Sequence, residues 1–196
     1  MKKTQGITLI EILITILIMS ILASVAGPSF IDSFKKRRLV SAVEELYSHL
    51  QLARSEALSG KILDPKNPKY DPIFVSFSGS GTSWSYGLSQ GTTCNPTITV
   101  NTDANACVLV VEVGNDVSAE DNVLMRVDGS EYEDVSLVVY GSGSVEFNPV
   151  RGTADSRRFF KFTSSSGESI WVRLGRLGNV TMCSSDFSEY SECPSS

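Results

Sequence analysis

Mostly apolar residues fill a long stretch near the N-terminus. Residues 7–26 are twenty consecutive positions whose only charged side chain is Glu11. As a helix that rises about 1.5 Å per residue, this stretch would reach roughly 30 Å, the thickness of the hydrocarbon core of a bilayer. The pattern therefore predicts a transmembrane segment over residues 7–27.

Glu11 is the exception within this apolar stretch. An ionised carboxylate inside hydrocarbon costs about 3 kcal/mol even on lenient insertion scales, so it needs a partner that offsets this cost. In the simplest interpretation Glu11 lies at the membrane interface and reaches the headgroups. Otherwise it requires a counter-charge that this sequence does not visibly provide.

A second helical pattern follows the apolar stretch. Gly27 and Pro28 predict a kink or a local unwinding, because proline lacks an amide donor and clashes with the preceding turn. Beyond them, apolar residues recur at alternating spacings of four and three. These residues are Leu39, Val43, Leu46, Leu50, Ala53 and Ala57. Gly60 suits a helix C-cap, so we expect one helix over residues 7–59 whose second half packs on a head.

After Gly60 the pattern is typical of strands. Short segments rich in β-branched and aromatic residues alternate with turns rich in glycine, serine and proline. The candidate strands are residues 73–77, 84–88, 97–100, 108–113, 123–127, 135–140, 144–147, 159–163 and 169–174. The predicted fold class is therefore α+β, with the long N-terminal helix packed on a mostly antiparallel β-sheet head over residues 60–196.

The four cysteines all lie in the predicted head and form no closely spaced Cys-x-x-Cys pairs of a zinc or redox site. This arrangement favours disulfides in an oxidising compartment. Of the three possible pairings we expect the one between sequence neighbours, Cys94 with Cys107 and Cys183 with Cys193. Each short loop closed in this way would gain about 2 to 3 kcal/mol of stability.

Charge and composition limit the possible functions. The formal net charge is −5, and removing Lys2 and Lys3 takes it to −7, which argues against general binding of polyanions. The only histidine, His49, has no second ligand at helical spacing, and no nucleophile elbow or phosphate-binding loop is present. We expect neither an enzyme nor a site for a cofactor or metal. The basic residues 35–38 either contact anionic headgroups or neighbouring subunits, or form a solvated face.

The N-terminus resembles a known signature. A short basic leader ends at Gly6 and is followed by Ile-Thr-Leu-Ile-Glu over residues 7–11. This pattern resembles the prepilin signature of type IV pilins and type II secretion pseudopilins, although Ile7 stands where that family most often has phenylalanine. The resemblance implies that a prepilin peptidase removes the leader, residues 1–6, by cleavage between Gly6 and Ile7. It also implies N-methylation of Ile7 and a contact between Glu11 and the N-terminal amine of a neighbouring subunit.

The resemblance also implies a location and partners. The chain would cross the inner membrane once with a periplasmic head, and would then be assembled into an extracellular pilus or a periplasmic pseudopilus. Its partners would be other major and minor pilins or pseudopilins, besides the prepilin peptidase and the inner membrane.

Three further segments resemble the branch that contains the minor pilins FimT and FimU and the secretion pseudopilin GspH. They are residues 52–58, 147–152 and 172–178. The function this implies is that of a minor pilin, a structural component of the pilus that is near its tip and takes part in assembly. A DNA-binding pilin for natural transformation and a minor pseudopilin of the type II secretion system are the alternatives.

A small set of basic residues carries the DNA-binding alternative. FimT-like proteins have a Gly-Arg-x-Arg stretch, of which this chain keeps Arg176 but has Gly178 in place of the second arginine. Arg173 and Lys161 complete the candidate DNA-binding residues, and Arg157 and Arg158 would lie near them if the last predicted strands pair. In the other interpretation the glycines only shape a turn, and Arg176 pairs with a carboxylate of the head.

Overall fold

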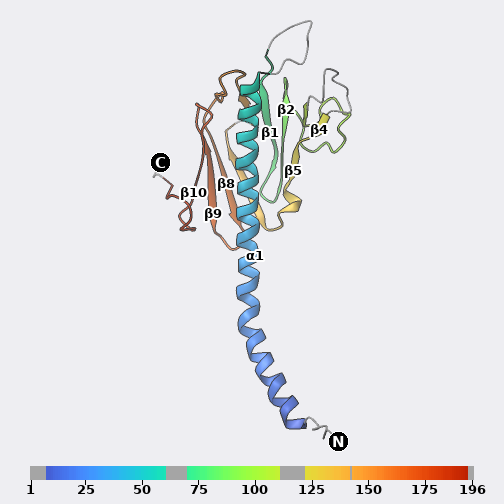
Figure 1. Cartoon of the computed structure of the whole chain (residues 1–196), viewed down its shortest axis with the longest axis vertical. Helices are drawn as coiled ribbons and strands as arrows, with labels where there is room; N and C mark the ends of the chain where they lie inside the picture. Colours follow the sequence, from blue (N-terminus) through green and yellow to red (C-terminus); the bar gives the residue numbers. More distant parts are fainter. Residues whose placement is uncertain (1–7, 61–69, 111–121, 142, 194–196) are drawn as a thin grey trace, which may run out of the picture.

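The computed structural model describes residues 8–60, 70–110, 122–141 and 143–193. Its dominant element is α1 (Leu9–Ser59), a helix of 51 residues. The first half of α1 projects away from the head and the second half lies along the strands (Figure 1). The fold is thus α+β, a helix packed on an antiparallel head, as the sequence predicts.

Local signals set both ends of α1. At its start the hydroxyl of Thr8 accepts a hydrogen bond from the Glu11 amide, and the Glu11 carboxylate accepts one from the Thr8 amide, which is a capping box. At its end Gly60 adopts φ 64°, the left-handed conformation in which glycine lacks the Cβ clash of other residues. The predicted helix end at Ser59 is confirmed, and residue 7, its predicted start, lies outside the described residues.

A kink or a local unwinding was predicted near Gly27 and Pro28, and the unwinding is wrong. The backbone stays helical through both residues, and Figure 1 shows only a curve of α1 in its N-terminal half. Proline removes one hydrogen bond of the helical ladder, while the bonds on either side continue. The predicted membrane segment, residues 7–27, lies only partly inside the described residues. Within the part that is described, no helix has a stretch both apolar and long enough to span a membrane.

In the described residues the head contains two four-stranded antiparallel sheets and a two-stranded one. The first sheet has the order β5-β2-β1-β7, the second the order β10-β9-β8-β6, and β3 pairs with β4. The strands are β1 (Ile73–Ser80), β2 (Ser83–Gln90), β3 (Val108–Val110), β4 (Asn122–Leu124), β5 (Arg126–Asp128), β6 (Val135–Tyr140), β7 (Ser144–Phe147), β8 (Arg158–Ser164), β9 (Ser169–Leu174) and β10 (Val180–Cys183). A short 3-10 helix, η2 (Gly129–Glu131), follows β5.

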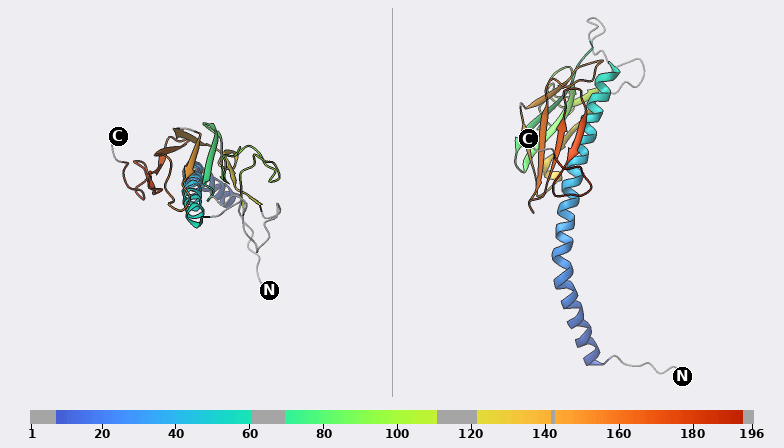
Figure 2. Two further views of the ribbon diagram at one scale, coloured as in Figure 1. Left: turned by 90° about the horizontal axis from the view of Figure 1, so that it is seen from above. Right: turned by 90° about the vertical axis from the view of Figure 1, so that its left-hand side faces the viewer.

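The core lies between α1 and the two larger sheets. Figure 2 shows α1 running along one side of the head. The six apolar residues of the predicted helical stripe are all buried, which confirms that α1 packs on the head through this face. The two sheets are tied together as well, because the rings of Phe77 and Phe160 stack at 4.9 Å and the Trp84 Nε1 donates a hydrogen bond to the Val135 carbonyl at 3.0 Å. Helix and sheets therefore share one core.

Three strand predictions need correction. Residues 97–100 form a turn and an irregular segment in place of a strand, and they lie in the loop that the Cys94–Cys107 disulfide closes. The predicted strand 123–127 is divided at Met125 into β4 and β5, because the Met125 amide donates to the Cys107 carbonyl. β10 was not predicted. Of the predicted strand 108–113, β3 covers the first three residues and the remainder lies outside the described residues.

The structure contains two disulfides. Cys94 is joined to Cys107 and Cys183 to Cys193, which is the pairing expected from sequence proximity. The first bridge holds the loop beside β2, where the Cys107 side chain fills the space over Gly87. The second closes the C-terminal segment onto the edge strand β10. The first bridge therefore closes a loop between β2 and β3, and the second fastens the C-terminal segment to β10.

Candidate functional site

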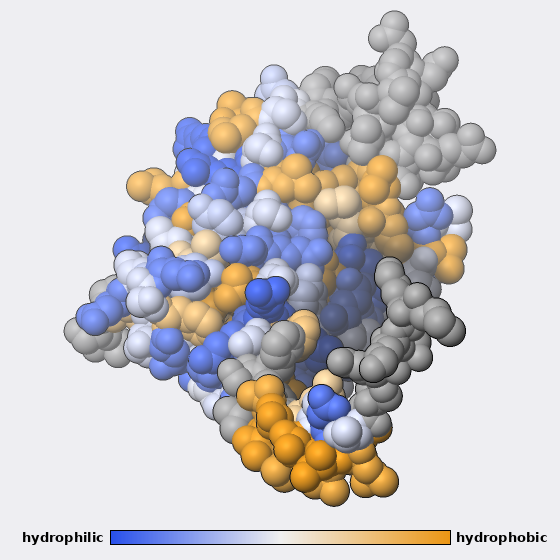
Figure 3. All heavy atoms as spheres, turned by 60° about the horizontal axis from the view of Figure 1, so that its bottom comes forward, coloured by the Kyte–Doolittle hydropathy of each residue, from blue (hydrophilic) through white to orange (hydrophobic). Residues whose placement is uncertain are grey.

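The first half of α1 exposes apolar side chains on all sides. Leu9 is 82% and Met19 70% exposed, and the other large apolar side chains that the structure describes in this half are at least about half exposed. Figure 3 shows these hydrophobic residues gathered at the end that faces the viewer, in front of a largely hydrophilic head. A helix that is apolar all round belongs in a membrane or among other helices. This half of α1 is therefore an interaction surface, and the core of the head does not use it.

Glu11 has a local partner that sequence reasoning did not find. Its Oε2 accepts hydrogen bonds from the amide and the hydroxyl of Thr8, both at 3.2 Å. Thr8 is neutral, so it supplies hydrogen bonds but no counter-charge. The charge of Glu11 remains available to a cation.

The basic residues 35–38 lie where α1 meets the lower end of the head. Lys36 Nζ lies 3.3 Å from Glu168 Oε1, and Arg38 Nη1 lies 3.2 Å from Glu133 Oε2. A hydrogen bond from Ser166 and the nearby Lys36 lower the pKa of Glu168, although burial opposes them. Ion pairs this exposed stabilise by less than about 1 kcal/mol. Half of this basic cluster thus contacts the head of its own chain, an arrangement that neither interpretation of the sequence included.

A basic groove lies at the upper end of β8, β9 and β10. It has a volume of about 490 Å³ and is lined by residues that include Arg157, Arg173 and Arg176, together with Asn179 and Thr181. The structure thus brings together two of the three candidate DNA-binding residues. Within the described part of the chain no carboxylate pairs with any of these three guanidinium groups. The expected pairing of Arg176 with a carboxylate is therefore not found there.

Arg158 and Lys161 do not line this groove. Arg158 is buried on the opposite side of β8, where its Nη2 lies 3.5 Å from Asp155 Oδ2 and 3.2 Å from the Ser144 carbonyl. Lys161 lies further along β8, with its Nζ 5.4 Å from the centre of the Trp171 ring. Lys161 therefore belongs to the face of the sheet that continues from the groove.

We call this surface the cationic face and define it by Tyr140, Phe159, Lys161, Trp171 and Arg173. Strand register explains it, since Phe159 is paired with Arg173 and Lys161 with Trp171, while the alternate residues of β8 and β9 are buried in the core. The Arg173 guanidinium lies 5.6 Å from the Phe159 ring centre, and the rings of Tyr140 and Trp171 stack at 5.5 Å. Cations and aromatic rings therefore alternate across the face.

Gly178 has a structural role at the turn between β9 and β10. It is buried with φ 75°, and a Cβ there would collide with the carbonyl oxygen of Gly152 and lie 3.0 Å from Arg54 Nε. An arginine does not fit this position. The glycine that replaces the second arginine of the FimT-like stretch is thus required by the packing of this chain.

The three segments that resemble the minor-pilin branch meet at this same junction. The Val150 amide donates to the Ala57 carbonyl at 2.9 Å, and the Ala154 amide donates to the Arg176 carbonyl at 3.0 Å. The helix end, the turn after β7 and the turn after β9 therefore interlock. Much of the sequence pattern at these segments is explained by the junction that they build.

His49 belongs to a polar network beneath α1. Its Nδ1 lies 3.0 Å from the Tyr86 hydroxyl, and the Tyr132 hydroxyl donates to Glu45 Oε2 at 2.8 Å. Burial lowers the pKa of His49, against a smaller opposing effect of Glu45, while burial raises that of Tyr132. These contacts occupy His49 as a packing residue of the helix face.

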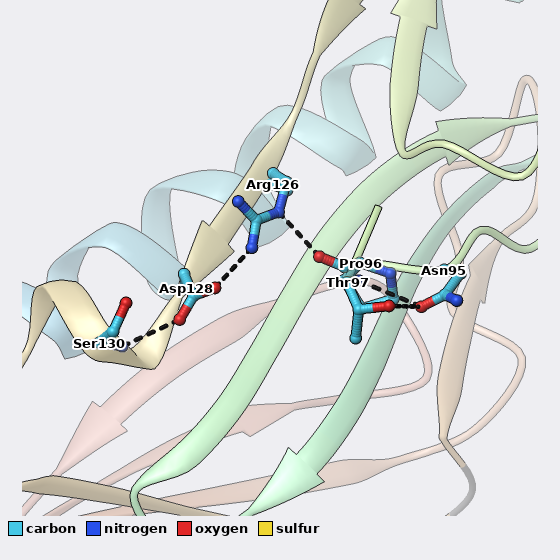
Figure 4. Close-up of polar contacts among 6 residues, drawn as sticks. All are labelled: Asn95, Pro96, Thr97, Arg126, Asp128 and Ser130. Carbon is cyan, nitrogen blue, oxygen red and sulfur yellow. Dashed lines mark hydrogen bonds and ion pairs between the residues drawn. The ribbon is translucent and has the colours of Figure 1, made fainter. Parts of the chain in front are cut away.

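Sequence reasoning also missed a polar cluster that holds the first disulfide loop (Figure 4). Arg126 donates from Nε to the Pro96 carbonyl at 2.8 Å and from Nη2 to Asp128 Oδ2 at 2.6 Å. Asp128 also accepts from the Ser130 amide at 3.0 Å, and this bond and Arg126 lower its pKa. Because Arg126 joins β5 to the loop, it provides a second attachment of the loop besides the disulfide.

Comparison with known proteins gives two findings. Residues 1–27 match the family model of the prokaryotic N-terminal methylation motif. Two fimbrial proteins of Pseudomonas aeruginosa are each 36% identical to this chain over 90 residues, which cover 42% of this chain and 58% of the relative. The chain thus spans less than two thirds of the length of these relatives. No solved structure matches it.

Proposed function

We propose that this type IV pilin-like chain, with its N-terminal methylation motif and its similarity to fimbrial proteins, is a minor subunit of a type IV pilus. It is anchored in the inner membrane with a periplasmic head and is then built into the filament near the tip. Its role is structural, and it acts in pilus assembly. Its partners are the prepilin peptidase and the neighbouring pilins.

The exposed apolar half of α1 is the observation that carries this proposal. The head has a complete core formed by the second half of α1 and the sheets. The first half adds length and apolar surface that the head does not need. Residues 7–27 are suited to the membrane before assembly and to the helices of other subunits afterwards.

The geometry at the start of α1 suits processing between Gly6 and Ile7. The capping box uses only Thr8 and Glu11, so removal of residues 1–6 leaves it intact. Cleavage creates a charged amine, methylated at Ile7. The amine of a neighbouring subunit then supplies the charge that Thr8 lacks, and Glu11 directs subunit assembly.

The test is the presence of the chain in purified surface appendages. Pili sheared from cells that produce the chain should contain it at low stoichiometry, and deletion of its gene should reduce piliation while secretion continues. Loss of secretion with normal piliation would instead identify a GspH-like pseudopilin of the type II secretion system. Absence from both structures, in cells with an active prepilin peptidase, contradicts the proposal.

The basic groove favours a second candidate function, that of a FimT-like pilin that binds DNA for uptake. Arg157, Arg173 and Arg176 gather there without carboxylate partners among the described residues. In an acidic chain, such a local patch provides only a few phosphate contacts, so the affinity should be low and should fall with salt. The patch has one cation fewer than the FimT-like stretch, because Gly178 stands in place of its second arginine.

A further inference from the structure

We infer that the cationic face and the basic groove together bind DNA as a single strand, with unpaired bases stacked on the exposed rings and phosphates held in the groove. This inference rests on the second candidate function and is independent of the pilus role. It follows from three features of the second sheet: its charge, its rings, and the position of Arg173 between rings and groove.

The strands of the second sheet carry basic but no acidic side chains, whereas the first sheet contains Asp128 and Glu146. The chain has 22 acidic residues, yet β6, β8, β9 and β10 contain none, while they contribute Arg158, Lys161 and Arg173. Arg158 is buried, so Lys161 and Arg173 give the outer face its charge. A phosphate backbone that approaches from this side meets no carboxylate on the strands, although the chain as a whole would repel it.

The rings of the face are accessible in a way that suits bases. Tyr140 is 47% and Phe159 37% exposed, whereas the aromatic residues on the inner face of β8 are fully buried. Stacking on such rings is the usual means by which proteins hold unpaired bases, and it tolerates any sequence. In a duplex the bases are already stacked on each other. A duplex can therefore offer phosphates to the groove but no free base to the rings.

Arg173 connects the two parts of the surface. Its guanidinium lies 5.6 Å from the Phe159 ring centre, and its side chain also lines the basic groove. A strand whose phosphate contacts Arg173 and Arg176 would have its adjacent base beside Phe159. The cations can bind the phosphate backbone while the rings stack on the bases, which is the arrangement of single-strand binding surfaces.

The experiment measures the binding of three labelled DNA probes by fluorescence anisotropy. The processed full-length chain in detergent micelles is titrated at low salt with a thymidine 20-mer, with a duplex of the same length and with an abasic strand of the same charge. We expect the thymidine strand to bind at least about fivefold more tightly than the abasic strand, a factor that corresponds to about 1 kcal/mol for one stacked base. It should also bind more tightly than the duplex, although the duplex has the higher charge density.

Variants separate the rings from the charges. Tyr140→Leu and Phe159→Leu should each weaken thymidine-strand binding at least about fivefold and leave abasic-strand binding unchanged. Tyr70→Leu, which changes a tyrosine of similar exposure outside the face, should have no effect. Arg176→Gln should weaken all three probes. Unchanged circular dichroism verifies that each variant is folded.

The outcomes distinguish the inference from the function on which it rests. If the duplex binds as tightly as the thymidine strand and the leucine variants bind both normally, DNA binding stands but the single-strand inference is overturned. If no probe binds at low salt, both are overturned. Equal binding of the abasic and thymidine strands would show that only phosphates are recognised, which also contradicts the inference.

Discussion

The carboxylate of Glu11 accepts hydrogen bonds from the amide and from the hydroxyl of Thr8, both at 3.2 Å. These bonds close the capping box at the start of α1, so Glu11 has a structural role within its own chain. We expect the capping role of this side chain and its proposed pairing with a neighbouring subunit to be separable.

Substitutions at Thr8 and Glu11 can separate them. Glu11→Gln keeps a hydrogen-bond acceptor but removes the charge. Membrane insertion and head folding should therefore be normal. Incorporation into filaments should fall about tenfold or more, because a charge-assisted contact is lost. Thr8→Ala removes the N-cap at a cost of about 1 kcal/mol and keeps the charge, so incorporation should be largely retained. Quantitative immunoblots of sheared filaments measure both. Normal incorporation of Glu11→Gln would contradict the proposed pairing of Glu11 with the amine of a neighbouring subunit.

Processing at Gly6 gives a second prediction. Intact mass and N-terminal sequencing of chain extracted from membranes should show a protein that begins at N-methylated Ile7. Cells without prepilin peptidase provide the control, and the chain extracted from them should keep the leader of residues 1–6. A retained Met1 in cells with active peptidase would contradict the prediction.

Regular patterns were the predictable part of the fold. The helix end at Ser59 followed from a glycine C-cap, and the buried stripe of α1 followed from helical spacing, since both depend on local chemistry. Residues 97–100 have strand-forming side chains, yet a disulfide and the Asn95 side chain, which accepts hydrogen bonds from Thr97, hold this segment in a loop. β7 alternates between half-buried and buried residues, but β10 has only Cys183 buried and so shows no period. Tertiary constraints decided these cases.

The candidate site was predictable only in part. Arg176 was identified from a motif and Arg173 as a basic residue near it, and the groove brings both together with Arg157. The rings of the cationic face were not singled out, because their alignment depends on strand register, which the sequence does not specify without knowledge of the pairing. The reason for Gly178 was also hidden, since it lies in contacts with residues more than twenty positions away.

The second disulfide should order a local segment. In a Cys183→Ser/Cys193→Ser variant, amide hydrogen exchange should increase most over residues 184–191 and little in β8, because the bridge closes this segment alone. The segment keeps its other contacts, which include the bond from the Ser184 hydroxyl to the Ser169 carbonyl and the packing of Phe187 and Tyr190 on the core. The loss of stability should be about 2 to 3 kcal/mol or less. Peptide mapping of the unreduced chain should recover both bridges as found here. Uniform exchange across the sheet would show a wider role for the bridge.

Gly178 and Gly167 form a matched pair for a test of the junction. Both have positive φ, but a Cβ at Gly167 meets nothing within 4 Å, whereas one at Gly178 meets the Gly152 carbonyl and Arg54. Gly167→Ala should cost about 1 to 2 kcal/mol from backbone strain alone. Gly178→Ala should cost about 1 to 3 kcal/mol more, because it adds steric overlap. Thermal unfolding of the two variants measures the difference, and equal melting temperatures would show that the junction accommodates a side chain.

His49 should make the stability of the head depend on pH. Burial lowers its pKa in the folded state below the ordinary value of 6.5, so the unfolded chain binds the proton more readily. The stabilising contribution of neutral His49 is therefore fully present above about pH 6.5 and is lost as the pH falls from there through the lowered pKa. Glu45 faces the same network and opposes this shift. His49→Gln should therefore reduce the change of melting temperature between about pH 7.5 and 5.5. The change of melting temperature at lower pH, which comes from the carboxylates, should remain. Tyr86→Phe, which removes only the hydroxyl beside Nδ1, provides the matched control because it keeps His49 and its burial. If the variant without histidine loses as much stability on acidification as the parent chain, the proton is taken up elsewhere.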